Sequence, residues 1–235
     1  MKIFHKNKRF FIVILTIVLL MNHNMVYGQL DNTQTMTKSG TTAAQFLKIG
    51  VDARATAMGN AFTAMEGDVS SIFWNAAGLA NVQRLETIFV NNDWLAGVSF
   101  HYLGFALPLR RVGVLGLSVT SLTVPDDKVR TVTKPEGTGE YWGAQDLAVN
   151  LSFARKLTDK FSIGGNIKYI QQTIWHSHTN TFALDLGALF VTPFKDIRLG
   201  ASLANYGGEL HMTGRDQKLS VDPDPINQGN VEFVN

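Results

Sequence analysis

The sequence predicts an all-β protein whose antiparallel strands form a β-barrel in a bacterial outer membrane. Three observations predict this class: polar and apolar residues alternate along seven segments, the connections alternate between short and long, and the chain starts with a secretion signal. No later stretch is long and apolar enough for a spanning helix. A membrane form of this chain must therefore be a closed barrel, because only helices and closed barrels satisfy every backbone polar group in hydrocarbon.

Residues 1–28 have the pattern of a secretory signal peptide. A basic start precedes an apolar run over residues 10–21, and Val26 and Gly28 supply small side chains before a cut at Gln29. The run is shorter than the roughly 20 apolar residues of a spanning helix. This length favours a signal peptide over a membrane anchor.

Charge and cysteine content exclude several functions. Removing residues 1–28 takes away four basic residues and no acidic ones, so the formal charge changes from 21 − 19 = +2 to 17 − 19 = −2. No basic patch remains that would favour nucleic acid. The absence of cysteine excludes a thiol nucleophile, a zinc site with cysteine ligands and a lipid-modified N-terminal cysteine.

The chain between the signal and the first strand divides into two parts. Residues 29–44 are polar and predict a flexible N-terminal arm. Residues 45–83 are dense in Ala, Gly and Met, and they predict short helical pieces that pack tightly inside the barrel as a plug or hatch. The pieces end in the run Asn75-Ala76-Ala77-Gly78-Leu79-Ala80, where Gly78 is expected to stop a helix.

From residue 84 onward the pattern has a period of two, which predicts strands with one apolar and one polar face. Residues 147–154 are the clearest case, because Leu, Val, Leu and Phe alternate with Ala, Asn, Ser and Ala. The expected strands are residues 85–93, 96–107, 112–123, 144–156, 160–173, 181–192 and 196–205.

A water-soluble β-sandwich also alternates, and three features favour the barrel. The polar positions are small and uncharged, several strands reach the roughly 9–11 residues that cross a bilayer, and the connections differ in length, as in outer-membrane barrels. The expected short turns are residues 108–112, 156–160 and 192–196, and the expected long loops are residues 125–140, 173–180 and 205 onward. Aromatic residues near strand ends fit interface girdles, with core packing as the alternative; they are Trp94, Tyr141, Trp142, Trp175, Phe194 and Tyr206.

The predicted strand number is odd, although single-chain bacterial barrels have even numbers and an open edge cannot face lipid. Residues 205–235 contain no lipid-facing strand and predict an outer loop. We therefore expect residues 84–235 to form the first half of a barrel with its outer loops.

Several motifs resemble the PorV/PorQ family. They are residues 46–62, Asp68 with residues 73–80, and residues 204–208 with 212–216. The resemblance implies a FadL-like outer-membrane barrel of fourteen strands with an N-terminal plug, of which this chain covers the first half to two thirds. Position 76 departs from the family pattern, since Ala76 stands where the family has Pro, and we expect a looser turn there.

The same resemblance implies a role in the type IX secretion system of Bacteroidota. There, PorV-like proteins bind the C-terminal signal domains of secreted cargo and pass them from the translocon to a surface attachment complex. The implied partners are cargo signal domains, other outer-membrane proteins of that system and the lipid bilayer.

No residue pattern predicts an enzyme, a metal site or a cofactor. His176 and His178 share a strand face, but no carboxylate cluster accompanies them. Asp126-Asp127 and Asp222-Pro223-Asp224 lack the spacing of a calcium loop. The nucleophile-elbow pattern Gly-x-Ser-x-Gly is absent.

Three charged residues fall on the polar faces of successive strands, namely Lys168, Asp185 and Arg198. They could form a polar track for a ligand. They could instead pair with each other or with plug residues such as Arg54, Glu66 and Asp68. Pairing is favoured, because buried charges need partners.

Three functions remain open from the sequence. The first is cargo shuttling in type IX secretion, the second is a FadL-like channel for hydrophobic small molecules with residues 45–83 as a movable hatch, and the third is a purely structural barrel. A channel should have an apolar pocket between plug and wall, whereas a shuttle should expose apolar residues on its outer loops. The small polar inner positions disfavour the channel.

Overall fold

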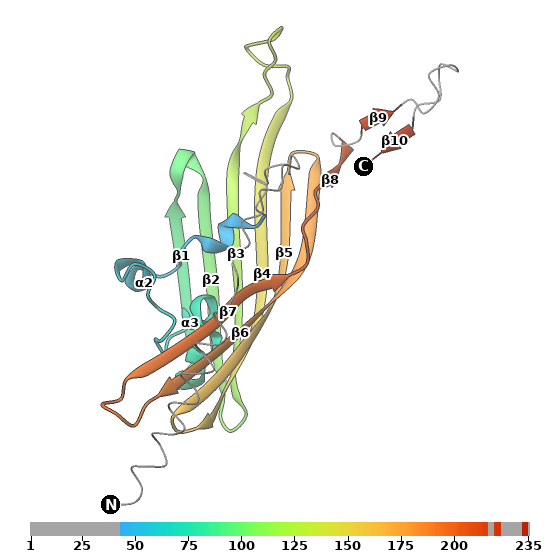
Figure 1. The fold of residues 1–235 in the computed structure, drawn as a ribbon. Coiled ribbons are helices and arrows are strands. Elements are labelled where there is room, and N and C mark those ends of the chain that lie inside the picture. The colour runs from blue at the N-terminus through green and yellow to red at the C-terminus, as the bar shows by residue number, and fades with distance from the viewer. Residues whose placement is uncertain (1–42, 216–218, 222–231, 235) are drawn as a thin grey trace, which may run out of the picture. The chain divides into compact units, whose positions relative to one another are not determined.

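The computed structural model describes residues 43–215, 219–221 and 232–234 of the chain (Figure 1). The predicted signal peptide and almost all of the predicted arm lie outside these residues. Short helices come first in the described part, and they are η1 (Gln45–Lys48), α2 (Ala53–Ala57), α3 (Ser71–Trp74) and η2 (Ala76–Asn81). A further turn of 3₁₀-helix, η3 (Leu95–Gly97), lies between the first two strands.

Long strands make up most of the remaining described residues, so the all-β class is confirmed. They are β1 (Glu86–Asp93), β2 (Ser99–Leu109), β3 (Gly113–Lys128), β4 (Tyr141–Thr158), β5 (Phe161–Ile174), β6 (Ser177–Val191) and β7 (Arg198–Gly207). Short strands follow: β8 (Thr213–Gly214), β9 (Leu219–Val221) and β10 (Glu232–Val234).

Strands β1 to β7 form one antiparallel sheet in which each strand pairs with its neighbour in sequence. The sheet is open, with β1 and β7 at its two edges. β8 adds a short pairing to the start of β6, at Ser177 and His178, and β9 pairs with β10 in a separate ribbon. The central strands are long, with 16 residues in β3, 18 in β4, 14 in β5 and 15 in β6.

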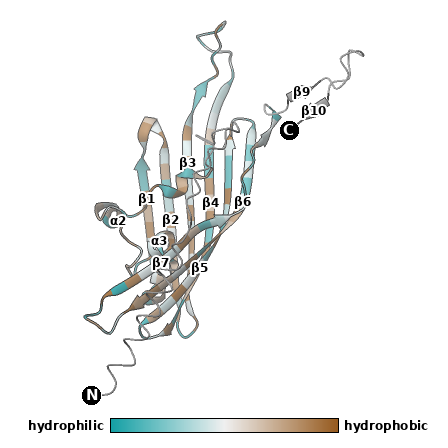
Figure 2. Ribbon diagram, viewed as in Figure 1, coloured by the Kyte–Doolittle hydropathy of each residue, from teal (hydrophilic) through white to brown (hydrophobic). Residues whose placement is uncertain are grey.

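The two faces of the sheet have opposite chemistry, and the exposed one is apolar. In β4, Leu151 is 55% exposed, whereas the adjacent Ser152 is 1% exposed. The same alternation runs through the neighbouring strands, where hydropathy changes from residue to residue (Figure 2). A sheet in water buries its apolar face. This sheet instead buries the face that carries its small and polar side chains, together with a few large ones such as Phe100 and Tyr102.

The N-terminal segment, residues 45–82, covers that buried face, which we call the inner face; the opposite face is the outer face. Ile72 and Leu79 pack with Ala106, Val114 and Ala154 of the sheet. Two further apolar clusters join the segment to the strands: Val51 with Phe100 and Tyr102, and Phe46 and Leu47 with Ala148, Ile170 and Ala183. Among the described residues, no helix combines the length and hydropathy needed to cross a membrane.

Several predicted boundaries are wrong. Residues 96–97 belong to η3 rather than to a strand, and β3 extends into the predicted loop 125–140, which shrinks to residues 129–140. β4 begins at Tyr141, three residues before the predicted strand start at residue 144. Most of the predicted loop 173–180 is strand, and β5 and β6 are joined by Trp175 and His176 alone. The predicted loop from 205 onward begins with the end of β7 and contains β8, β9 and β10.

The helix stop at Gly78 is also wrong. Gly78 lies inside η2, which ends at Asn81. A Cβ at position 78 would lie 2.6 Å from the Met65 carbonyl oxygen and 2.6 Å from Ser71 Oγ. The glycine is needed for close packing within the segment and not for a left-handed turn.

Candidate functional site

The inner face carries a cluster of buried polar side chains under the N-terminal segment. Buried polar groups need hydrogen-bond partners. The partners of these side chains therefore show how the inner face is held together and how the segment is attached to it. The buried polar residues of β3 to β6 are Ser118, Thr120, Asn150, Ser152, Ser162, Asn166, Lys168, Ser177, Thr179 and Asp185.

A buried ion pair forms the centre of this cluster. The Lys168 ammonium lies 2.7 Å from Asp185 Oδ2, and the two side chains are 8% and 5% exposed. Asn166 Nδ2 also donates to Asp185 Oδ2, at 2.6 Å. The Lys168 ammonium neutralises the Asp185 carboxylate, and the Asn166 amide donates a further hydrogen bond to it. Together these contacts lower the cost of burying the carboxylate.

The irregular end of β7 completes this network. The pairing of β6 with β7 shifts register between Leu184 and Leu186, and Asn205 there has a left-handed backbone with φ of 58°. This conformation points the Asn205 N–H at Asp185 Oδ1, at 2.7 Å, while Asn205 Oδ1 accepts from Lys168 Nζ at 2.7 Å. Asn tolerates the left-handed region better than most residues, which explains its use at this bulge.

Two asparagines connect the N-terminal segment to the strands. Asn166 Nδ2 donates to the Ile72 carbonyl oxygen at 3.0 Å. Asn75 Nδ2 donates to the carbonyl oxygens of Thr63, at 2.7 Å, and Ala188, at 3.2 Å. Asn75 Oδ1 accepts from the N–H of Ala77 and so caps η2. Ala76 is the first residue of η2, a position that suits the Pro it replaces.

Glycines on the inner face let the segment approach the backbone of the strands. A Cβ at Gly164 would lie 2.5 Å from the carbonyl carbon of Ala76, and one at Gly187 would meet Asn75 Oδ1. Likewise, a Cβ at Gly200 would meet the Thr63 carbonyl oxygen. Side chains at these positions would push residues 63–77 away from the sheet.

Ion pairs lie at the margin of the segment. Arg198 of β7 pairs with Glu66 at 3.1 Å, and Asn81 Nδ2 also donates to Glu66 at 2.5 Å. Arg54 pairs with Asp68 at 2.6 Å within the segment, and its guanidinium lies 4.9 Å from the centre of the Phe62 ring. These pairs are more exposed than Lys168–Asp185, with Arg198 44% and Arg54 50% exposed.

The structure therefore brings three of the eight predicted residues, Glu66, Asn75 and Arg198, to contacts between segment and strands. Lys168 and Asp185 pair with each other within the strands. Arg54, Asp68 and Gly78 act within the segment. The three strand charges pair as the pairing hypothesis has it, Lys168 with Asp185 and Arg198 with Glu66. Arg54 and Asp68 pair with each other instead of with a strand, and the assignment of these residues to a plug and a lumen stays a prediction. Sequence reasoning missed Asn166 and Asn205, although Asn166 and Gln172 are the two amides on the polar face of their strand.

The two histidines of the predicted pair lie in different elements. His176 lies in the β5–β6 turn with a ring nitrogen 3.0 Å from Arg215 Nη2, and His178 lies in β6 rather than in a loop. No group of three or more potential metal ligands occurs among the residues described by the structure. Asp127 accepts from Arg130 in the β3–β4 connection, and Asp222 and Asp224 lie outside the described residues.

The fold and this cluster define a class: an open antiparallel sheet with an exposed apolar face, whose polar face is held to an N-terminal helical segment. Comparison of the sequence with protein-family models gives a match to type IX secretion system protein PorV over residues 31–190. The chain belongs to this family, which associates it with type IX secretion. No curated protein and no solved structure matches the chain.

Proposed function

We propose that this chain is an outer-membrane component of type IX protein secretion that binds the C-terminal signal domains of secreted cargo and transfers them to the surface attachment machinery. The observation that carries the proposal is the family match over residues 31–190. It includes the N-terminal segment and all strands from β1 to β5, with nearly all of β6.

The proposed location is the cell outer membrane, after removal of residues 1–28. Its support is the outer face, where large apolar side chains such as Phe105, Leu117 and Leu151 are exposed along strands long enough to cross a bilayer. The six aromatics near strand ends are all exposed, from 36% at Trp175 to 70% at Tyr206, which favours interface girdles over core packing. The described strands would form part of a FadL-like barrel wall, and the N-terminal segment would be its plug.

The surface proposed for cargo is the β3–β4 hairpin. Its two strands continue past the β5–β6 turn, since Ala144 of β4 already pairs with Ile174 at the end of β5 (Figure 1). Its tip, residues 129–140, includes the fully exposed Val132. The turns at the other end of the same strands are short, at residues 110–112 and 159–160. This difference supports assigning the hairpin to the outer surface.

A channel with a movable hatch has less support. The hollow of about 280 Å³ between residues 43–48 and strands β5 to β7 has polar lining groups such as Lys48, Asn205 and Glu209. The buried hydrogen bonds of Asn75 and Asn166 would have to break for the segment to move. These features favour a fixed plug.

Retention of a purified cargo C-terminal signal domain on the immobilised full chain tests the proposal. We expect binding by the unmodified chain and loss of binding when residues 129–140 are replaced by an Asn-Gly turn. The matched control shortens residues 192–197, the β6–β7 connection at the opposite end, and should still bind. No retention of any such domain by the unmodified chain would overturn the cargo-binding proposal, and equal retention by both variants would overturn the assignment to the hairpin.

A further inference from the structure

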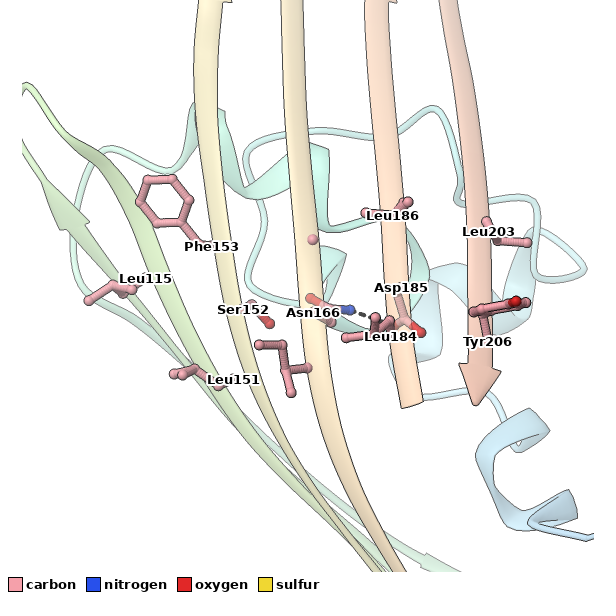
Figure 3. A pocket seen from close by; sticks show the side chains of 12 residues that line it. Leu115, Leu151, Ser152, Phe153, Asn166, Leu184, Asp185, Leu186, Leu203 and Tyr206 are labelled. Atoms are coloured by element: carbon pink, nitrogen blue, oxygen red, sulfur yellow. Dashed lines mark hydrogen bonds between the residues drawn. The ribbon is translucent and has the colours of Figure 1, made fainter. Parts of the chain in front are cut away.

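The outer face has a hollow with a volume of about 560 Å³ (Figure 3). It follows a row of directly paired residues across five strands, in which Gly165 is central. The row is Leu115, Phe153, Gly165, Leu186 and Leu203, in strand order β3 to β7. Every other member of the row has a bulky apolar side chain, so the missing side chain at Gly165 creates the hollow.

The backbone dihedral angles do not require glycine at this position, and an added Cβ would have one tight contact. Gly165 has no left-handed φ, and a Cβ built on it would lie 3.2 Å from the Asp185 carbonyl oxygen and 3.7 Å from Leu186 Cδ2. The adjacent Gly164, on the inner face, is crowded against Ala76 and Ala77 by comparison. Gly164 is therefore needed for the close approach of Ala76 and Ala77 to the sheet. At Gly165 the main consequence of lacking a side chain is the open hollow on the outer face.

The walls of the hollow are hydrocarbon. The next row of paired residues adds Leu151, Ile167, Leu184 and Tyr206, and these side chains are between 48% and 70% exposed. The polar residues beside the hollow are Ser152, Asn166 and Asp185, whose side chains are buried on the inner face. Asp185 is already paired with Lys168 there.

We propose that the Gly165 hollow binds the hydrocarbon chain of a membrane lipid. The inference rests on the outer-membrane location proposed above, because the hollow is continuous with the uncharged apolar face that the membrane would cover. A hydrocarbon chain in the hollow would make close van der Waals contacts with Phe153 and Leu186. An unfilled hollow would forfeit these contacts. A protein partner would be expected to meet a polar rim with hydrogen-bonding groups, and the outward side chains around Gly165 offer none except the Tyr206 hydroxyl.

Crosslinking to a phospholipid with a photoactivatable group on its acyl chain tests this inference. The full chain is folded into phosphatidylcholine vesicles that contain this lipid, illuminated, and analysed by peptide mass spectrometry. We expect adducts concentrated on the peptides that contain Phe153, Ile167 and Leu186. Gly165→Leu fills the hollow and should remove this concentration. Ala201→Leu adds the same side chain to an exposed position of β7 that does not line the hollow, and it should leave the concentration intact.

Two results would overturn the inference. Adducts spread evenly over the outer face, including Phe89 and Leu103, would indicate ordinary surrounding lipid without a site. Crosslinks from the same residues to another polypeptide in native membranes would indicate a protein occupant. Insertion is measured separately, by resistance of the vesicle-bound chain to alkaline extraction. Failure to insert contradicts the proposed location, whereas insertion without concentrated adducts contradicts only the lipid site.

Discussion

The two faces of the β1–β7 sheet differ in what their residues are needed for. On the inner face, small and polar side chains are buried, and single atoms matter, as with Gly164 beside Ala76 or Asp185 between Lys168 and Asn205. On the outer face, side chains such as Leu151 and Leu186 are exposed and share one property, their apolarity. The inner face specifies how the N-terminal segment docks, and the outer face specifies the surroundings of the protein. Substitutions should therefore be judged by face more than by residue type.

The largest effect is expected from Asp185→Leu. This change leaves the Lys168 ammonium buried without its counter-charge and removes an acceptor for Asn166 and Asn205. Losing one partner of a buried pair costs about 3–5 kcal/mol. The measurement is the denaturant midpoint of the chain folded in detergent micelles, followed by the gel shift between heated and unheated samples.

The control for Asp185→Leu is the double variant Asp185→Leu with Lys168→Met, which removes both charges. Replacing a buried pair by apolar residues is often close to neutral, so the double variant should recover part of the lost stability. An unchanged midpoint in the single variant would contradict the assignment of Lys168 and Asp185 as a stabilising pair.

A smaller loss of stability is expected from Gly164→Ala, and almost none from the same change at the adjacent Gly165. A methyl group at Gly164 would lie 2.5 Å from the carbonyl carbon of Ala76 and 2.6 Å from the Ala77 nitrogen. Overpacking of this kind costs about 1–3 kcal/mol, so Gly164→Ala should lower the midpoint. Gly165→Ala adds the same methyl group to the outer face and should change stability by less than about 1 kcal/mol.

The Gly164 and Gly165 variants also test the assignment of the faces directly. Protease sensitivity of residues 45–82 is the second measurement, because undocking of the segment should expose it only in Gly164→Ala. Equal effects of the two substitutions would contradict the division into an inner and an outer face.

The alternation of residues was enough to predict the faces, because one residue of slip would exchange every side chain between them. It also placed Lys168 and Asp185 on one face, and their pairing followed from the cost of burying charge. The turn at Trp175 and His176 could not be predicted in this way. It contains no Gly or Asn, although Trp175 has a positive φ of 51°. Polar residues run from the end of β5 through the start of β6, so no change in composition marks the turn.

The contacts between the N-terminal segment and the strands could not be predicted from the sequence, for a different reason. Asn166 donates to the carbonyl oxygen of Ile72, a residue 94 positions earlier, and Asn75 donates to Ala188, 113 positions later. Such bonds depend on how the segment lies across several strands. A run of small residues indicates that something packs closely, but it does not say which backbone atoms meet.

The smallest loss of stability is expected from breaking the Arg198–Glu66 ion pair at the margin of the N-terminal segment. Arg198 is 44% exposed and Glu66 is 20% exposed, so water screens the pair, and exposed ion pairs typically contribute about 0.2–1 kcal/mol. A double-mutant cycle with Arg198→Met and Glu66→Gln measures the coupling, and Gln retains an acceptor for Asn81 Nδ2. The coupling should weaken further in high salt. Only a desolvated ion pair resists screening by salt. A coupling energy as large as that of Lys168–Asp185, and insensitive to salt, would therefore contradict the assignment of Arg198–Glu66 as a weak, solvent-screened pair.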